Sequence, residues 1–167
     1  MLRRAAAVCV LVFEAAIAVP VAQSRPDFSG EWRPVDRNTP QQQATNGGPP
    51  PPPRTLSIAV AQTAVALTIA RRVESEGHEA VYNFTYRLDG TESVNQMGPL
   101  VFYTRGSWEG ASLVLASDVS VEDRRLGTLR ETYTLEAGKL TVETIRTGPA
   151  GVMKDKTVHE KMARPPQ

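Results

Sequence analysis

The sequence predicts an all-β protein, an antiparallel up-and-down meander of about eight to ten strands that closes into a barrel. Apolar and polar residues alternate through most of the chain after residue 54, which is the pattern of half-buried strands. Glycine-containing pairs separate these segments at hairpin spacing, and no long segment has helical periodicity. The chain of 167 residues is long enough for one such domain, expected over 26–164.

The strands are predicted in order from this alternation. The expected strands are 56–60, 65–69, 82–88, 113–115, 129–135 and 140–144. The expected turns are Glu76-Gly77, Asp89-Gly90, Trp108-Glu109-Gly110, Leu126-Gly127 and Ala137-Gly138. Connections this short place successive strands side by side and antiparallel.

The hairpin formed by 129–135 and 140–144 can be registered from its pattern. Leu135 is expected opposite Leu140, and Glu131 opposite Thr144, because a slip of one residue would mix the two faces. A loop that spans Glu136 to Lys139 is preferred, because alanine is poor at the positive φ of a tight type I′ turn.

Residues 1–18 predict an export signal. Arg3 and Arg4 form a basic start, an apolar stretch follows, and Ala16-Ile17-Ala18 is a cleavage site with Ala22 as a second candidate. Glu14 departs from the pattern, and a cytosolic N-terminal helix is the alternative. A periplasmic or extracellular protein is expected. Its mature chain would have no cysteine, and so no disulfide or thiolate site, because the single cysteine lies in the signal.

Charge argues against nucleic-acid binding and membrane insertion of the mature chain. Without Arg3, Arg4 and Glu14, the 19 basic and 18 acidic residues become equal in number. The charges are dispersed, with no basic stripe, and Arg71-Arg72 is interpreted as a solvated, self-compensated loop end. The longest apolar run is far shorter than the ~20 residues of a spanning helix.

The segment 35–54 is rich in proline, glutamine and glycine and cannot contribute to a core. It is interpreted as a long connecting loop after the first strand. The alternative is that the proline run 49–53, a stiff polyproline II stretch, docks a proline-recognising protein partner.

The motif Asp27-Phe28-Ser29-Gly30-Glu31-Trp32, followed by the meander, resembles the start of lipocalin-like (calycin) barrels, and more closely that of exported bacterial proteins that begin with DFSGxW. The resemblance implies that Gly30 and Trp32 are structural, with Trp32 closing the barrel floor. It also implies that a basic residue at the end of the last strand, Lys161 or Arg164, packs over the indole. The Thr-Asp-Tyr motif of true lipocalins is absent, and the continuation after Trp32 does not support biotin binding.

An aromatic cluster is the candidate ligand site. Tyr82, Phe84 and Tyr86 share one face of a strand and, with Trp108 and Tyr133, are predicted to line a pocket for a small apolar or amphipathic molecule. The alternative is that these rings fill the barrel interior.

Glu131 shares the apolar face of its strand, and Arg146 lies diagonal to it across the hairpin. The two are candidate groups for orienting a ligand. The alternative is a structural ion pair or a hydrated group at the barrel mouth. Of the two histidines, His159 is expected on a strand surface, and His78 lies near a loop.

No catalytic motif, cofactor site or metal site is predicted from the sequence. A non-catalytic binding module is favoured. Two other classes remain open: a structural or protein-interaction module of the cell envelope with a filled barrel, and a barrel isomerase or cyclase.

Overall fold

The computed structural model describes residues 25–35, 54–75 and 77–163. The predicted signal and nearly all of the predicted 35–54 loop lie outside these residues. The described part forms one antiparallel sheet of ten strands in the order β4-β3-β2-β1-β10-β9-β8-β7-β6-β5. The strands are β1 (Gly30–Pro34), β2 (Arg54–Gln62), β3 (Ala66–Ser75), β4 (His78–Arg87), β5 (Glu92–Met97), β6 (Leu100–Glu109), β7 (Ser112–Val121), β8 (Arg124–Glu136), β9 (Lys139–Gly148) and β10 (Gly151–Lys161).

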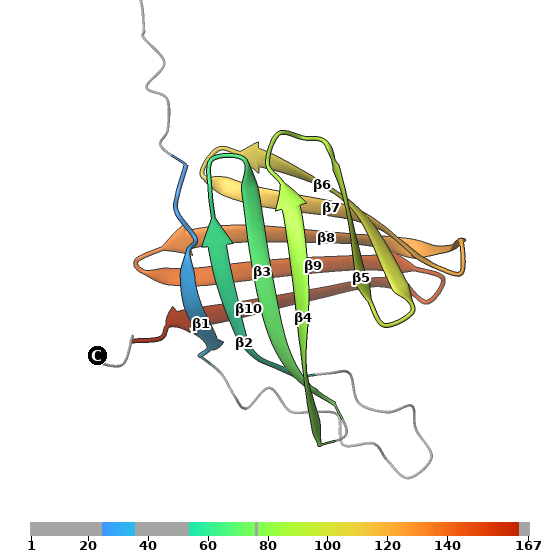
Figure 1. Cartoon of the computed structure of the whole chain (residues 1–167), viewed down its shortest axis with the longest axis horizontal. Coiled ribbons are helices and arrows are strands. Elements are labelled where there is room, and N and C mark those ends of the chain that lie inside the picture. Colours follow the sequence, from blue (N-terminus) through green and yellow to red (C-terminus); the bar gives the residue numbers. More distant parts are fainter. Residues whose placement is uncertain (1–24, 36–53, 76, 164–167) are drawn as a thin grey trace, which may run out of the picture.

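The sheet curls into a barrel, so that β1–β4 cross β8–β10 (Figure 1). This confirms the predicted all-β meander and barrel. Along β4, the side chains of Phe84 and Tyr86 are buried, whereas those of Asn83, Thr85 and Arg87 are exposed. The alternation in the sequence is therefore the alternation between barrel interior and solvent.

The two ends of the sheet, β4 and β5, meet through side chains. The Asn95 side chain accepts a hydrogen bond from Thr85 N (2.7 Å) and donates one to Thr85 O (3.1 Å). The Ser93 hydroxyl accepts one from Arg87 N (2.8 Å). These groups satisfy backbone atoms at the edge of β4 that would otherwise lack partners, and so hold the barrel nearly closed.

The predicted register of the β8–β9 hairpin is confirmed, with Leu135 opposite Leu140 and Glu131 opposite Thr144. The predicted loop is wrong. Glu136 pairs with Lys139, and the connection is a two-residue turn with φ of 48° at Ala137 and 75° at Gly138. A turn with positive φ at both positions matches the twist of the strands, and here that match outweighs the steric cost at alanine.

The expected strands do not include β5, β6 or β10, and two expected turns, Trp108-Glu109-Gly110 and Leu126-Gly127, are wrong. Leu126 and Gly127 lie inside β8, and the turn before this strand is formed by Glu122 and Asp123. Trp108 lies inside β6, and the turn after β6 is formed by Gly110 and Ala111. The inward face of β6 includes Thr104 and Gly106, which interrupt its apolar pattern. A Cβ on Gly106 would lie 2.8 Å from Arg87 O, so the closeness of β4 explains the glycine.

Trp32 is buried in the core at one end of the barrel, which is called the closed end below. It is 1% exposed, and its indole Nε1 donates a hydrogen bond to Phe28 O (2.9 Å). The Lys161 ammonium lies 5.3 Å from the centre of the ring. A Cβ on Gly30, whose φ is 142°, would lie 2.5 Å from Lys161 Cε, so Gly30 leaves room for that side chain. Arg164 lies outside the described residues.

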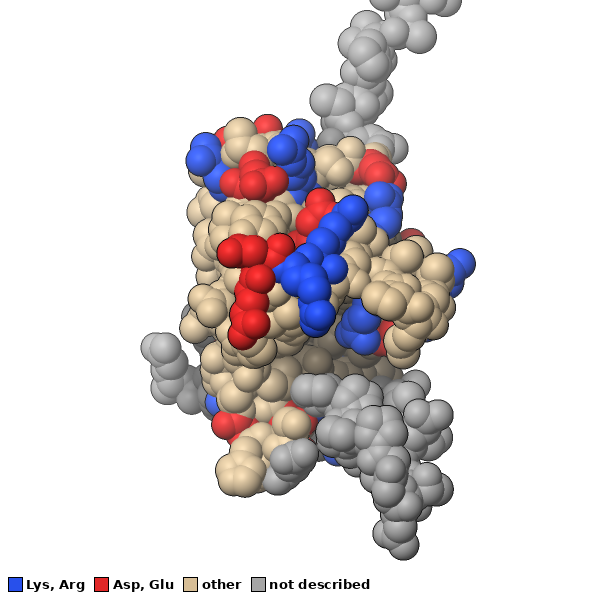
Figure 2. Space-filling view, turned by 90° about the vertical axis from the view of Figure 1, so that its right-hand side faces the viewer, with Lys and Arg blue, Asp and Glu red and all other residues tan. Residues whose placement is uncertain are grey.

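The outer surface carries charges of both signs. Cross-strand ion pairs join Arg125 to Asp118, Arg130 to Glu109 and Lys156 to Glu143. On the face shown in Figure 2, basic and acidic side chains lie next to one another. Among the described residues, no helix is long and apolar enough to cross a bilayer.

Candidate ligand cavity

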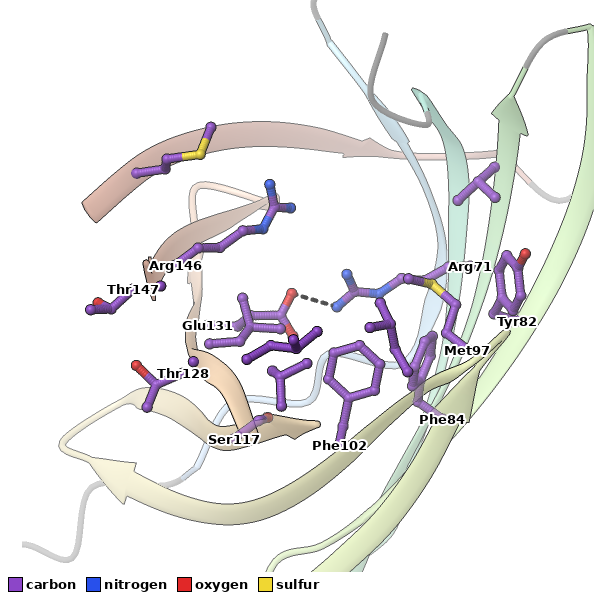
Figure 3. A pocket seen from close by; sticks show the side chains of 18 of the residues that line it. Arg71, Tyr82, Phe84, Met97, Phe102, Ser117, Thr128, Glu131, Arg146 and Thr147 are labelled. Carbon is purple, nitrogen blue, oxygen red and sulfur yellow. Dashed lines mark hydrogen bonds and ion pairs between the residues drawn. The ribbon is translucent and has the colours of Figure 1, made fainter. Parts of the chain in front are cut away.

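One half of the barrel interior is hollow and the other half is filled. Leu67, Ile69, Leu113, Leu115 and Leu140 pack the filled half with no exposed surface. The hollow half is a cavity of about 710 Å³, within the range of small-molecule sites. Figure 3 shows the cavity with side chains from opposite walls of the barrel pointing into it.

The wall formed by β4, β5 and β6 is apolar and aromatic. Phe84 stacks on Tyr86 with ring centres 6.3 Å apart and planes 3° apart. It also meets the edge of Phe102 at 6.1 Å and 86°. Tyr82 and Met97 extend this wall toward the mouth of the cavity.

A buried ion pair crosses the inner end of the cavity. Arg71 Nη2 donates to Glu131 Oε1 (2.7 Å) and to the Tyr133 hydroxyl (2.6 Å). The Glu131 side chain is 5% exposed and that of Arg71 is 25% exposed. The Arg71 guanidinium also lies over the Phe84 ring, 5.5 Å from its centre. The inner end of the cavity is therefore polar but carries no net charge.

This pair corrects two predictions. Arg71 is not a solvated loop end, because β3 runs on to Ser75 and places Arg71 on its inner face. The close partner of Glu131 is Arg71 rather than Arg146. The two partners are 60 residues apart and lie on strands that are not neighbours in the sheet, so no hairpin register could pair them.

Burial and charge fix the protonation of the inner groups. Burial lowers the pKa of Arg71, but the Glu131 carboxylate and the Tyr133 hydroxyl more than offset this, and the pKa is raised overall. Burial raises the pKa of Tyr133 well above its usual value, although nearby Arg71 opposes the shift. Burial and then Glu131 raise the pKa of Tyr86. Both phenols therefore stay protonated and can donate hydrogen bonds at neutral pH.

Arg146 lies nearer the mouth. It pairs with Leu129 in the β8–β9 ladder, is exposed and lines the cavity. Figure 3 shows its side chain extending over the cavity from the wall opposite Arg71. It makes no ion pair with any residue in the described ranges.

The structure brings together most of the predicted site residues. Those that line the cavity are Tyr82, Phe84, Tyr86, Glu131 and Arg146. Tyr133 is 1% exposed and lies beneath the cavity, where its hydroxyl holds Arg71. Tyr133 therefore supports the site without forming its wall.

Trp108 does not belong to this cavity, and its predicted grouping with the Tyr82–Tyr86 aromatics is wrong. Its ring stacks on Phe28 (5.9 Å, 7°), and Arg25 lies over it at 5.3 Å. It lines a smaller pocket of about 340 Å³ with Gln62 and Leu88. The inner face of β6 runs from Phe102 at the cavity to Trp108 at the closed end, which separates the two aromatics.

His159 is buried at 3% exposure, not on a strand surface as predicted. Burial lowers its pKa, and the charge of Arg71 acts in the same direction. The described residues include no group of three or more histidine, cysteine, aspartate or glutamate side chains placed to hold a metal ion.

Arg71 is the functional candidate that the sequence reasoning missed. The signal was present, because Leu67, Ile69 and Arg71 follow one another at the period of two that marks one face of a strand. The predicted strand ended at residue 69, since two adjacent arginines are typical of a solvated turn.

Comparison with known proteins supports the fold. No family model matches the chain, and no curated protein matches it in sequence. Among solved structures, the zebrafish ileal bile acid-binding protein in complex with cholic acid is similar at 18% identity and a TM-score of 0.54, over 81% of this chain and 98% of that chain. Secretory abundant heat soluble protein 4 from Ramazzottius varieornatus is similar at 15% identity and a TM-score of 0.53, over 81% and 94%. At these identities the likeness establishes the β-barrel fold.

Proposed function

We propose that this protein is a non-catalytic binding module that holds one small apolar or amphipathic molecule inside the barrel. The observation that carries the proposal is the cavity of about 710 Å³, bounded by aromatic side chains on one wall and by a neutral ion pair at its inner end. Aromatic walls with few polar groups favour apolar ligands, and convergent polar groups fix their orientation.

The binding role is favoured over the other two classes. A filled barrel would leave no such cavity. An isomerase or cyclase that used Glu131 as its acid or base would need that carboxyl group free at the ligand, whereas the Glu131 carboxylate is bonded to Arg71. The bile acid-binding protein with cholic acid, which has a similar fold, also supports a binding role.

We also propose that the protein is exported to the periplasm or the extracellular space, because residues 1–18 have the pattern of a signal peptide. Intact-mass measurement of the secreted protein should give the mass expected for cleavage after Ala18 or Ala22. Uncleaved protein confined to the cytosol would contradict the proposal.

Titration with Nile red, a neutral apolar dye, tests the binding role. Ala80 lines the cavity and Ala116 is exposed on the outer face of β7. Ala80→Trp should fill cavity volume and abolish saturable dye binding, whereas Ala116→Trp should leave binding unchanged. Dye fluorescence is the better readout, because Trp32 and Trp108 both lie at the closed end of the barrel. Equal binding by both variants would contradict the proposal.

A further inference from the structure

The two arginines that line the cavity differ in their electrostatic surroundings. Arg71, at the inner end, is bonded to the Glu131 carboxylate, so the pair carries no net charge. Arg146, toward the mouth, has no carboxylate partner within the described part of the chain. The free positive charge of the cavity therefore lies at its outer end.

The inner end offers hydrogen bonds without net charge. Arg71 uses Nη2 for both of its hydrogen bonds, so the donors on Nη1 are not engaged by a described residue. The Tyr86 hydroxyl lines the cavity and likewise makes no hydrogen bond with a described residue. A ligand oxygen at this depth could accept from Arg71 Nη1 and could exchange a hydrogen bond with Tyr86.

A carboxylate would be poorly placed at the inner end. It would approach Arg71 beside a second carboxylate, Glu131, and repulsion from Glu131 would offset attraction to the guanidinium. A neutral oxygen meets no such repulsion. At the mouth, the same carboxylate would meet only the positive charge of Arg146, in partial contact with water.

We propose that the cavity binds amphipathic anions with the charged group outward at Arg146, and with a neutral oxygen at the other end of the ligand against Arg71 and Tyr86. The proposal rests on the proposed binding function and specifies its ligand class. The preferred ligand is a compact apolar molecule with an anionic group at one end and a hydroxyl or carbonyl at the other.

A matched series of probes separates the two ends. Decanol, decanoate and ω-hydroxydecanoate, each competing with Nile red, share one apolar chain and differ in their terminal groups. In a purely apolar pocket the ω-hydroxyl would weaken binding by roughly tenfold, because it would lose its water without replacement. Here ω-hydroxydecanoate should bind at least as tightly as decanoate.

Two variants assign the ends to residues. Arg146→Gln should weaken the binding of decanoate by about fivefold, which is the contribution of a partly exposed ion pair, and leave the affinity for decanol unchanged. Arg72→Gln is the matched control, because Arg72 is exposed and points away from the cavity on the same strand as Arg71. Tyr86→Phe removes only a hydroxyl, so the fold should persist while ω-hydroxydecanoate loses affinity relative to decanoate.

The outcomes distinguish this inference from the function on which it rests. If decanol and Nile red bind but Arg146→Gln leaves the affinity for decanoate unchanged, the outward placement of the charge is overturned. If the ω-hydroxyl weakens binding to the wild type, the inner contact with Arg71 and Tyr86 is overturned. In both cases the proposed cavity function stands. If no probe binds, decanol and Nile red included, both are overturned.

Discussion

Replacing Glu131 by leucine tests whether the Arg71–Glu131 pair is a buried element of the structure. The variant leaves the Arg71 guanidinium at the inner end of the cavity without its carboxylate. Breaking a fully buried pair costs about 3–5 kcal/mol of unfolding free energy. Because the Arg71 side chain is 25% exposed, cavity water can solvate it, and a charged hydrogen bond in that setting is worth about 1.5–3 kcal/mol. We expect a loss in that lower range.

The control is a surface pair with the same geometry. Arg130 and Glu109 are also 2.7 Å apart, but their side chains are 44% and 57% exposed. Glu109→Leu should therefore cost less than about 1 kcal/mol. Urea unfolding followed by far-ultraviolet circular dichroism, with a shared m-value, measures both losses.

A double variant separates the pair from the packing around it. Arg71→Met with Glu131→Leu removes both charges and should recover most of the stability lost in Glu131→Leu. The reasoning is refuted if Glu131→Leu costs no more than Glu109→Leu, or if the losses of the two single substitutions simply add.

Three further predictions follow from the described residues. Trp32→Ala should lower the free energy of unfolding by about 3–5 kcal/mol, the usual range for a large buried aromatic. Trp108→Ala should lower it less, because that ring is only partly buried; equal losses measured by urea unfolding would contradict the assignment of Trp32 to the barrel floor. Gly127→Ala should leave little folded protein, because its Cβ would lie 2.0 Å from Thr147 O at a φ of 156°; a wild-type melting temperature would contradict that contact. The pKa of His159 is lowered from 6.5 in the folded state, so the unfolded chain binds more protons in acid and the free energy of unfolding should fall as the pH drops below about 6.5. His159→Leu should reduce this dependence of the unfolding free energy on pH, and an unchanged dependence would contradict the prediction.

The strands of the barrel were predictable from the sequence where apolar and polar residues alternate along a single strand. The alternation around Phe84 identified β4, and the pattern of β8 and β9 fixed the register that places Glu131 opposite Thr144. Each of these inferences uses residues close together in the chain. Strand β6 was not predicted, because Thr104 and Gly106 occupy inward positions and so interrupt the alternation of apolar and polar residues.

The candidate site was predictable only in part, because its charges meet across the barrel. Alternation placed Glu131 on an inner face, but nothing local relates it to Arg71, 60 residues away. The alternation also does not show how far along the barrel a residue of one strand face lies. Trp108 and Phe102 share one face of β6, yet one lies at the closed end and the other at the cavity.

Methionine methyl resonances provide the most direct test of the cavity. Met97 and Met153 line it, whereas Met162 follows β10 at the closed end, where its N donates to Glu31 O. In a protein labelled at the methionine methyl groups, titration with decanol should shift the Met97 and Met153 signals until one molecule is bound per chain. The Met162 signal should not move. Equal shifts at Met97, Met153 and Met162, or no saturable shift at Met97 and Met153, would contradict a ligand cavity in the open half of the barrel.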